Sequence, residues 1–209
     1  DDGSCIYAGC MDPLATNYDP IATVDDGSCR FGCDAAIGDS IGGGILFYLD
    51  TDCNGLIAAT EDQQMDPGMY PSGTSSYHVP WGCPTIPIAT LDSSIYGGYD
   101  NTVDILAQCS QDPIAASIAK NSGQGKGGSY TDWYLPSKGE LNLMYIERNL
   151  IGGFDESCII NLNFQECFYW TSTSFNDGLA GAQSFTCGNS GCGTQYSQGK
   201  SNHYRVRAI

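Results

Sequence analysis

Cysteine is the residue type whose number and spacing could do the most chemistry in this sequence. The chain has 11 cysteines and 2 histidines among 209 residues. Zinc sites usually show Cys-x-x-Cys pairs or a histidine companion. Here the closest cysteine spacing is Cys29–Cys33, and neither His78 nor His203 lies near a cysteine pair. Disulfide bonds therefore explain the cysteines better than a metal does. They imply an oxidising, extracellular setting.

A short motif is repeated at the start of the chain. Residues 1–5 and 25–29 both read Asp-Asp-Gly-Ser-Cys, and each copy leads into a Gly-Cys step, at Cys10 and Cys33. A fixed period of this kind predicts small modules in series. We therefore expect a Cys- and Asp-rich repeat module over residues 1–33. It contains one full unit at 9–29, preceded by the tail of an earlier unit.

The repeat suggests a disulfide assignment. If each unit closes on itself, Cys10 pairs with Cys29, and Cys5 is left unpaired or forms an intermolecular bond. Pairing of Cys5 with Cys10 is the alternative that stays open. The even number of cysteines from Cys33 onward allows complete pairing of the rest. Proximity along the chain selects two pairs and leaves two as the simplest remainder: Cys158–Cys167 and Cys187–Cys192, then Cys33–Cys53 and Cys83–Cys109.

Oxygen-bearing side chains in the repeat could hold calcium. Ca²⁺ takes about 6–8 oxygen ligands, and extracellular modules bind it weakly. The candidate ligands are Asp12, Asn17, Asp19, Asp25 and Asp26. The same residue types favour turns, so plain turns are the alternative. Calcium is thus a candidate cofactor, and no organic cofactor is expected.

A second acidic segment fits the EF-hand loop pattern. Within residues 50–61, the defined positions carry Asp50, Asp52, Asn54, Gly55 and Glu61. An EF-hand needs a helix on each side, but residues 42–49 and 56–59 are typical of strands. A β-hairpin whose turn carries Asp and Asn-Gly explains the same letters. We expect a hairpin turn, with Asp50, Asp52, Asn54 and Glu61 as a second candidate calcium set.

The elements that must position these residues are short. Helices are expected at 102–109, capped by Asp100 or Asn101, and at 114–121, with Pro113 in the first turn. A third helix follows Ser137, which can form a capping box with Glu140. Strands are expected at 133–135, 168–172, 182–187 and 204–209. The fold class is therefore α+β, with few short helices, a small twisted antiparallel sheet and long loops.

Six ordered blocks carry a resemblance to a known family. They are Gly-Gly-Gly-Ile-Leu-Phe-Tyr-Leu (42–49), Gly-Leu-Ile-Ala-Ala (55–59), Trp-Gly-Cys (81–83), Asp-Trp-Tyr-Leu-Pro-Ser-Lys-Gly-Glu-Leu-Asn-Leu-Met (132–144), Tyr-Trp-Thr-Ser-Thr (169–173) and Tyr-Arg-Val-Arg-Ala-Ile (204–209). Residues 38–209 thereby resemble the family named for the C-terminal domain of the Legionella collagen-like adhesin. This resemblance implies a C-type-lectin-like fold, in the branch shared with formylglycine-generating enzymes. The N-terminal segment is similar to Cys- and Asp-rich tandem repeats of secreted bacterial surface proteins.

Charge limits the ligands and partners. The chain carries 8 Lys and Arg against 24 Asp and Glu, a net charge of −16. Such a surface repels phosphate backbones and anionic headgroups, so nucleic acid is not an expected partner. The resemblance implies sulfated polysaccharide as a ligand, but the scarcity of basic residues argues against a polyanion here. No apolar run approaches the roughly 20 residues of a membrane span.

These observations favour binding over catalysis. No Gly-x-Ser-x-Gly elbow frames a nucleophile, and no catalytic residue is expected. We expect a non-enzymatic extracellular surface protein, an adhesion or ligand-binding module for a carbohydrate or protein. The candidate ligand-binding residues are loop aromatics: Trp81, Tyr70, Tyr77, Tyr96 and Tyr99. The block at residues 132–137 is interpreted as core and helix cap.

A structural role is the alternative function. The N-terminal repeat could meet the next copy of the chain head to tail, and such a heterologous contact builds filaments when it does not close. The partners would then be other copies of this chain, or neighbouring modules of a surface protein.

Overall fold

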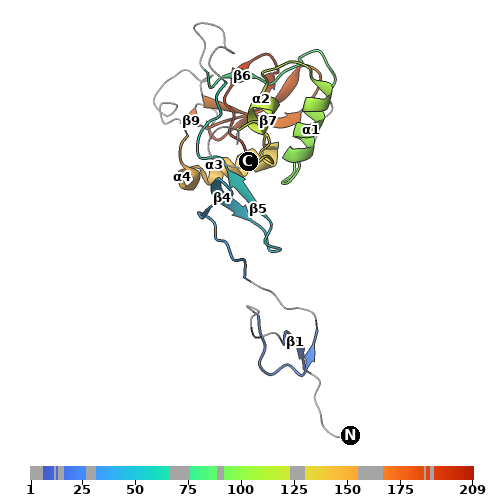
Figure 1. The fold of residues 1–209 in the computed structure, drawn as a ribbon, viewed down its shortest axis with the longest axis vertical. Helices are drawn as coiled ribbons and strands as arrows, with labels where there is room; N and C mark the ends of the chain where they lie inside the picture. Colours follow the sequence, from blue (N-terminus) through green and yellow to red (C-terminus); the bar gives the residue numbers. More distant parts are fainter. Residues whose placement is uncertain are drawn as a thin grey trace. The chain divides into compact units, whose positions relative to one another are not determined.

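The computed structural model describes residues 7–11, 13, 17–26, 32–65, 76–88, 92–122, 130–154, 167–185, 187–188 and 191–209. Contacts divide the chain into two compact units. The first unit comprises residues 1–36 and 49–54, and the second comprises residues 37–48 and 55–209 (Figure 1).

The described residues of the first unit contain very little regular structure. Strands β1 (Ala8–Gly9) and β2 (Val24–Asp25) pair in parallel, with Ala8 opposite Val24. The carbonyl of Tyr7 accepts hydrogen bonds from the backbone N–H groups of Thr23 and Val24, at 2.8 and 3.1 Å. Among the described residues of this unit, only Cys10 is buried. Burial of apolar surface therefore contributes little to its stability.

A small sheet begins the second unit. Its order is β3 (Ser40–Ile41), β4 (Gly44–Leu49), β5 (Gly55–Ala58). The turn between β4 and β5 belongs to the first unit. There the Asp50 carboxylate accepts hydrogen bonds from the backbone N–H groups of Asp52 and Asn54, both at 2.9 Å. As the sequence predicts, strands and not helices flank this turn.

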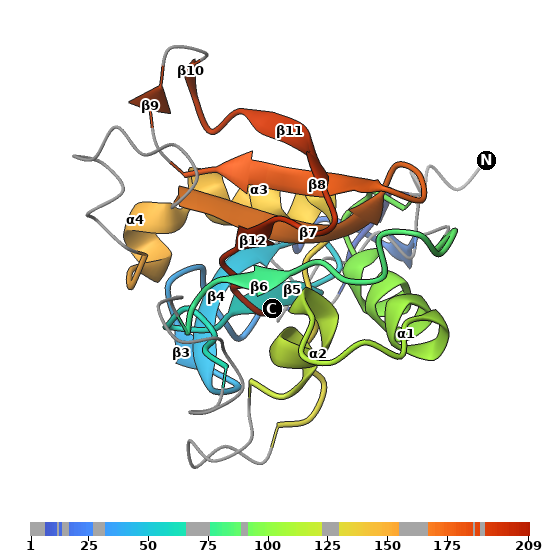
Figure 2. The same ribbon diagram turned by 90° about the horizontal axis from the view of Figure 1, so that it is seen from above.

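The main sheet of the second unit is antiparallel and has the order β11 (Gln195–Gly199), β8 (Leu179–Ser184), β7 (Phe168–Ser174). Helix α3 (Lys138–Ile146) packs against β7 and β8 (Figure 2). Two short pairs complete the strands: β6 (Val79–Pro80) with β12 (His203–Tyr204), and β9 (Cys187–Gly188) with β10 (Gly191–Cys192).

Helix α3 forms where the sequence predicts it. The hydroxyl of Ser137 accepts from the backbone N–H of Glu140 at 3.2 Å, and the Glu140 carboxylate accepts from the Ser137 N–H at 2.6 Å. This reciprocal capping box satisfies two N–H groups that would otherwise lack partners at the start of a helix. Helix α4 (Arg148–Ile151) follows directly.

The two other helices begin differently from the prediction. Helix α1 (Gly98–Gln108) starts before the residues expected to cap it. Asn101 is instead buried inside the helix and donates to the carbonyl of Asp92 at 2.7 Å. Helix α2 (Ala115–Lys120) starts after Ile114, so Pro113 precedes it and does not occupy its first turn. The start of α1 thus depends on a contact outside the helix, whereas the contacts at the start of α2, between Ser117 and both Ile114 and Asp112, are local.

The C-terminal segment passes through the middle of the second unit. Arg205 exchanges backbone hydrogen bonds with β7, donating to Phe168 and accepting from Trp170. The carbonyl of Ala208 accepts from Ala59 at 3.0 Å. The strand predicted at 204–209 is thus extended and hydrogen-bonded, although only His203–Tyr204 is a regular strand.

A buried ionic cluster anchors this segment. The Asp62 carboxylate accepts from the Arg207 guanidinium at 2.6 and 2.9 Å, from Arg205 at 3.0 Å and from the Tyr169 hydroxyl at 2.8 Å. All four side chains are buried. One Asp62 oxygen accepts only from Arg207, and the other accepts from Arg205 and Tyr169. The cost of desolvating these ions is therefore offset only while the cluster stays complete.

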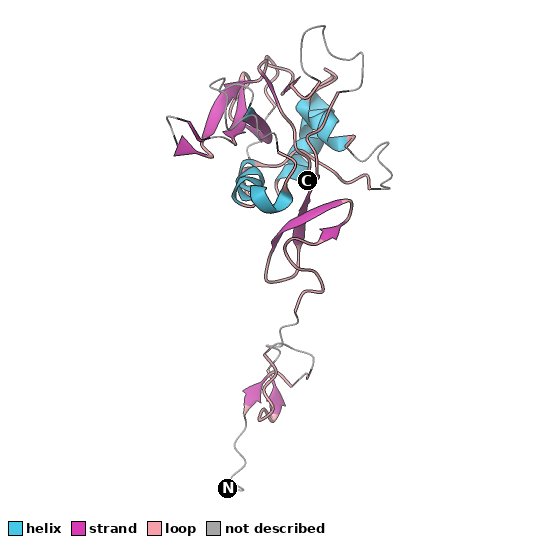
Figure 3. Ribbon diagram, turned by 90° about the vertical axis from the view of Figure 1, so that its left-hand side faces the viewer, coloured by secondary structure: helices cyan, strands magenta, loops and turns pink. Residues whose placement is uncertain are grey.

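Two apolar clusters form the core of the second unit. One surrounds Trp81 and Trp170 and includes β6, β7, β8, α1 and α2. The other, around Phe47, Leu141 and Tyr169, joins the β4–β5 hairpin to α3 and α4. Figure 3 shows the short helices and small sheets that these clusters join, and the α+β class is confirmed. Within the described ranges, no helix has the length and apolar character needed to span a bilayer.

Candidate functional site

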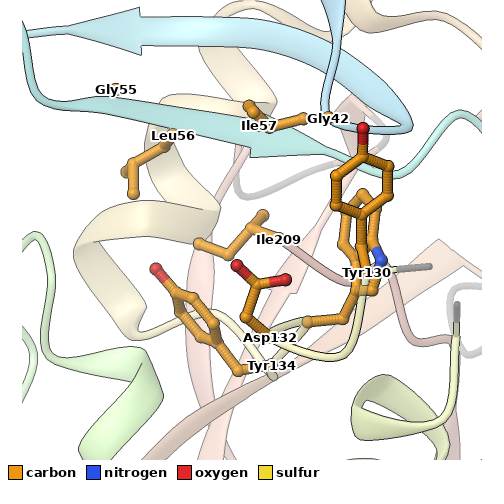
Figure 4. A pocket seen from close by; sticks show the side chains of 9 residues that line it. Gly42, Gly55, Leu56, Ile57, Tyr130, Asp132, Tyr134 and Ile209 are labelled. Atoms are coloured by element: carbon orange, nitrogen blue, oxygen red, sulfur yellow. The ribbon is translucent and has the colours of Figure 1, made fainter. Parts of the chain in front are cut away.

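A cleft of about 260 Å³ opens on the second unit (Figure 4). One wall comes from the β3–β5 sheet, and the other from the extended segment that precedes α3. The residues that line it are Gly42, Gly55, Leu56, Ile57, Tyr130, Asp132, Trp133, Tyr134 and Ile209. Mostly apolar clefts with a few polar groups are the usual form of small-ligand sites.

The extended segment at residues 130–134 supplies most of the polar and aromatic groups. Tyr134 and Ile209 exchange backbone hydrogen bonds of 2.8 and 3.1 Å, which hold the segment straight. Tyr130, Asp132 and Tyr134 line the cleft together with the intervening Trp133. The Asp132 carboxylate lies between the two tyrosine rings (Figure 4).

Glycines let the opposite wall approach closely. Gly42 and Gly43 both have positive φ, at 58° and 84°, a backbone conformation that glycine adopts without a steric cost. A Cβ at Gly43 would lie 3.1 Å from Cδ2 of Tyr130. A side chain at this position would therefore make a tight contact with the Tyr130 ring.

Glu140 holds the cleft residue Tyr134 in place. It is fully buried. Its carboxylate accepts from the backbone N–H of Tyr96 at 2.8 Å and from the Tyr134 hydroxyl at 3.3 Å. Burial raises the pKa of Glu140, while hydrogen bonds from Ser137 oppose that shift. The pKa of Tyr134 is raised far above its ordinary value by burial and by the nearby Glu140 charge. Tyr134 is consequently a neutral hydroxyl in a fixed orientation.

Asp132 differs from Glu140 in its surroundings. It is exposed to solvent at the mouth of the cleft. Within the described parts of the chain, no hydrogen bond or ion pair engages its carboxylate. It can therefore accept hydrogen bonds from a ligand without breaking a contact of its own.

Further tyrosines continue from the cleft. The Tyr99 and Tyr134 rings lie 5.8 Å apart at 90°, and the Tyr48 and Tyr96 rings lie 6.3 Å apart at 62°. Tyr96 and Tyr99 are 43% and 44% exposed. We call Tyr48, Tyr96, Tyr99 and Tyr134 the tyrosine row. Glu140 connects its two pairs, because it contacts both Tyr96 and Tyr134.

The aromatic prediction is wrong for Trp81. Its side chain is 0% exposed, and its indole N–H donates to the Thr171 carbonyl at 2.8 Å. The Lys200 amino group lies 4.3 Å from the centre of its ring. Trp81 is thus a core residue and cannot meet a ligand, because the strands that bury it come from distant parts of the sequence.

The other predicted aromatics differ in position. Tyr77 is half-buried, accepts a hydrogen bond from Gln64 at 2.7 Å and packs under Arg205. Tyr70 lies outside the described residues. Tyr96 and Tyr99 are exposed and belong to the tyrosine row. Of the predicted aromatics that the structure describes, Tyr96 and Tyr99 are therefore the two that lie close to the cleft.

The calcium candidates stay predictions. In the first set, Asp12 lies outside the described residues, and Asp19 accepts a hydrogen bond from the backbone N–H of Ile21 at 3.0 Å. In the second set, Asn54 donates from its side chain to the Asp50 carboxylate at 3.1 and 3.3 Å. No group of three or more His, Cys, Asp or Glu residues suited to a metal occurs in the portion of the chain that is described.

The cysteines form disulfide bonds. Cys33 is bonded to Cys53 and Cys83 to Cys109, with Cα–Cα distances of 5.4 and 5.7 Å. These are the two pairs that the sequence left as the simplest remainder. Cys10 and Cys167 are also disulfide-bonded; their expected partners Cys29 and Cys158 lie outside the described residues, as does Cys5. The backbone register sets Cys187 opposite Cys192.

Sequence reasoning missed the cleft residues Tyr130 and Asp132. The block at 132–137 was interpreted as core and helix cap, which holds for Leu135 and Ser137 but not for Asp132. The alternation of Tyr130, Asp132 and Tyr134 in an extended segment was the available signal.

Comparisons with known proteins do not assign this chain to a family. No family model and no curated protein matches the sequence. Among solved structures, a fimbrial protein from Bacteroides ovatus ATCC 8483 is similar, with a TM-score of 0.39 and 17% sequence identity. The match covers 75% of this chain and 35% of that protein's chain.

Proposed function

We propose that this chain is a non-enzymatic binding module of an extracellular surface protein, and that its cleft binds carbohydrate. The observation that carries the proposal is the alternation of Tyr130, Asp132 and Tyr134 along one wall (Figure 4). It sets an exposed carboxylate between two tyrosine rings. Membership of the adhesin-domain family and a C-type-lectin-like fold are part of the same proposal.

The chemistry of these groups suits a sugar. A sugar ring presents C–H groups on its faces and hydroxyls around its edge. Tyrosine rings can pack against the C–H faces, and the Tyr134 hydroxyl is already bonded to Glu140. A carboxylate accepts charge-assisted hydrogen bonds from hydroxyls, which are stronger than neutral ones. Asp132 is exposed and available for that role.

The site is also held rigidly enough to recognise a shape. Tyr134 is fixed through its backbone by Ile209 and through its hydroxyl by Glu140. Supporting contacts of this kind keep binding groups in place before the ligand arrives. The disulfide bonds favour an oxidising, extracellular compartment.

A glycan array probed with the full chain tests the proposal. We expect binding to carbohydrate, and we expect Tyr130→Ala to weaken it at least tenfold. Asp132→Asn should weaken it by less, because the amide keeps one acceptor oxygen. Phe175→Ala is the matched control, since Phe175 is an aromatic residue 41% exposed and outside the cleft. An array without binding, or equal losses in Tyr130→Ala and Phe175→Ala, would refute the proposal.

The filament alternative stays a prediction with a separate test. Electron microscopy of the native material distinguishes filaments of regular repeat from dispersed particles. The predicted partners, other copies of this chain or neighbouring surface-protein modules, depend on that result.

A further inference from the structure

The cleft is continuous with an exposed aromatic surface. Tyr134 lines the cleft and also contacts Tyr99, whose ring centre lies 5.8 Å away. The backbone N–H of Tyr96 and the hydroxyl of Tyr134 are both held by Glu140. Tyr48 extends the row, 6.3 Å from Tyr96. A ligand longer than the cleft would therefore meet the tyrosine row next.

The backbone at Tyr96 supports a role for this surface. Its φ is +72°, in the left-handed region that bulky side chains rarely adopt. The hydrogen bond from its N–H to the buried Glu140 fixes this conformation. Its side chain nevertheless stays 43% exposed, so packing of the ring into the core does not account for the strained backbone. Strain maintained at an exposed residue is a reason to suspect a binding role.

The ring orientations limit the form of the ligand. The Tyr99 and Tyr134 rings are perpendicular, at 90°, and the Tyr48 and Tyr96 rings meet at 62°. A flat crystalline polysaccharide face needs rings that share one plane. A single chain twists, so its successive sugars present their faces in different directions. The paired rings of the tyrosine row do not share one plane, so they suit a single twisted chain.

Charge limits the ligand further. Asp132 in the cleft and Asp100 and Asp104 on α1 are exposed, and the chain carries a net charge of −16. Lys120, whose amino group lies 5.7 Å above the Tyr99 ring, is the cation that contacts the row among the residues described. Sulfated or uronic sugars would be repelled by this balance, whereas Lys120 can donate a hydrogen bond to a neutral hydroxyl.

We infer that the ligand is a single, soluble, uncharged glycan chain of several sugars that extends from the cleft along the tyrosine row. This inference rests on the proposed function, because it places the chain's end in the same cleft. It adds the form, the length and the charge of the ligand.

Calorimetric titration of the full chain with soluble cello-, manno- and chito-oligosaccharides of two to six units tests it. We expect affinity for one series to rise at least tenfold between two and five units. Tyr99→Ala should abolish the rise in affinity with chain length, and Tyr99→Phe should restore it. Val103→Ala is the matched control, since Val103 is 46% exposed on the same helix and is not part of the row.

The outcomes separate the two proposals. Disaccharide binding that requires Tyr130 but does not strengthen with length overturns this inference and keeps the proposed function. Binding to crystalline cellulose or chitin that soluble chains fail to compete away also overturns it, as does preference for heparin over neutral chains. Absence of binding to any glycan, charged or uncharged, overturns both.

Discussion

The two units of this chain are stabilised by different means. In the described part of the first unit, Cys10 is the buried residue. The second unit has two apolar clusters and a buried ionic cluster. Small modules that cannot bury enough apolar surface rely on covalent cross-links. The disulfide bonds therefore have two roles: they substitute for an apolar core in the first unit and add to one in the second.

The disulfide bonds themselves show the contrast. Cys53 is exposed and Cys33 half-buried in the first unit. Cys83 and Cys109 are 7% and 6% exposed, inside the larger apolar cluster of the second unit. Reductants should therefore reach the bond between Cys33 and Cys53 first, because thiol–disulfide exchange requires access to the sulfur atoms.

The largest expected effect is that of Arg207→Met. It leaves the buried Asp62 carboxylate without its closest partner and removes donors from three backbone carbonyls. Breaking a buried ion pair in this way costs about 3–5 kcal/mol. Urea unfolding of the second unit, followed by tryptophan fluorescence, measures the change. Arg148→Met is the control, because Arg148 lies half-buried on α4 and should cost less than about 1 kcal/mol. Similar losses in both variants would contradict the role of the cluster.

Paired serine substitutions test whether each of the two disulfide bonds stabilises only its own unit. Cys83→Ser with Cys109→Ser should lower the free energy of unfolding of the second unit by roughly 2–4 kcal/mol. Cys33→Ser with Cys53→Ser should leave that unfolding transition unchanged and speed proteolysis around the first unit, where little else restrains the chain. Differential scanning calorimetry and limited proteolysis give the two readouts. If Cys33→Ser with Cys53→Ser lowered the unfolding temperature of the second unit, the two units would not be independent.

The features that the sequence predicted depend on neighbouring residues. The capping box of Ser137 and Glu140 spans one helical turn, so local pattern is sufficient. The bond between Cys33 and Cys53 was predicted as part of the simplest remainder, after proximity had paired other cysteines. The burial of Trp81 did not follow, because it depends on Thr171 and Lys200, far along the chain.

The candidate site shows the same limit. The alternation that sets Asp132 beside Tyr134 is local, yet the cleft exists only because Ile209 and the β3–β5 sheet meet that segment. Likewise Glu140 was predicted as a cap, and its contact with Tyr96 closes a loop of 44 residues. Long-range contacts decide whether a polar or aromatic residue lines the cleft, holds a lining residue in place or lies in the core.

A smaller effect on stability is expected at alkaline pH. It concerns the core of the second unit alone. Burial and the Asp62 charge raise the pKa of Tyr169 well above its ordinary value of 10.0. Stability from this group is complete below pH 10.0 and is lost as the pH rises above it, because only the unfolded state then releases the proton. The loss is about 1.4 kcal/mol per pH unit.

Tyr169→Phe provides the measurement. Urea unfolding should show a less stable variant near neutral pH, since the hydrogen bond to Asp62 is gone. Its stability should then fall less steeply than that of the unmodified protein above about pH 10. The difference between the two proteins cancels titration of the other groups. Parallel curves would mean that Tyr169 ionises in the folded state as readily as in the unfolded state.

The smallest effect on the whole molecule, and the most local, is that of calcium. If Asp19, Asp25 and their predicted companions bind Ca²⁺, the affinity should be weak, with Kd of roughly 10⁻⁴–10⁻³ M as in other extracellular modules. Chelation should then speed proteolysis within residues 1–36 and leave the second unit's unfolding unchanged, because a unit with so little buried surface has few other restraints. Asp19→Asn with Asp25→Asn should abolish the response to chelator, whereas Asp100→Asn, on α1 of the second unit, should preserve it. Identical cleavage with and without chelator would leave cross-links and turns as the explanation for the first unit, and its acidic residues would then serve as turn formers.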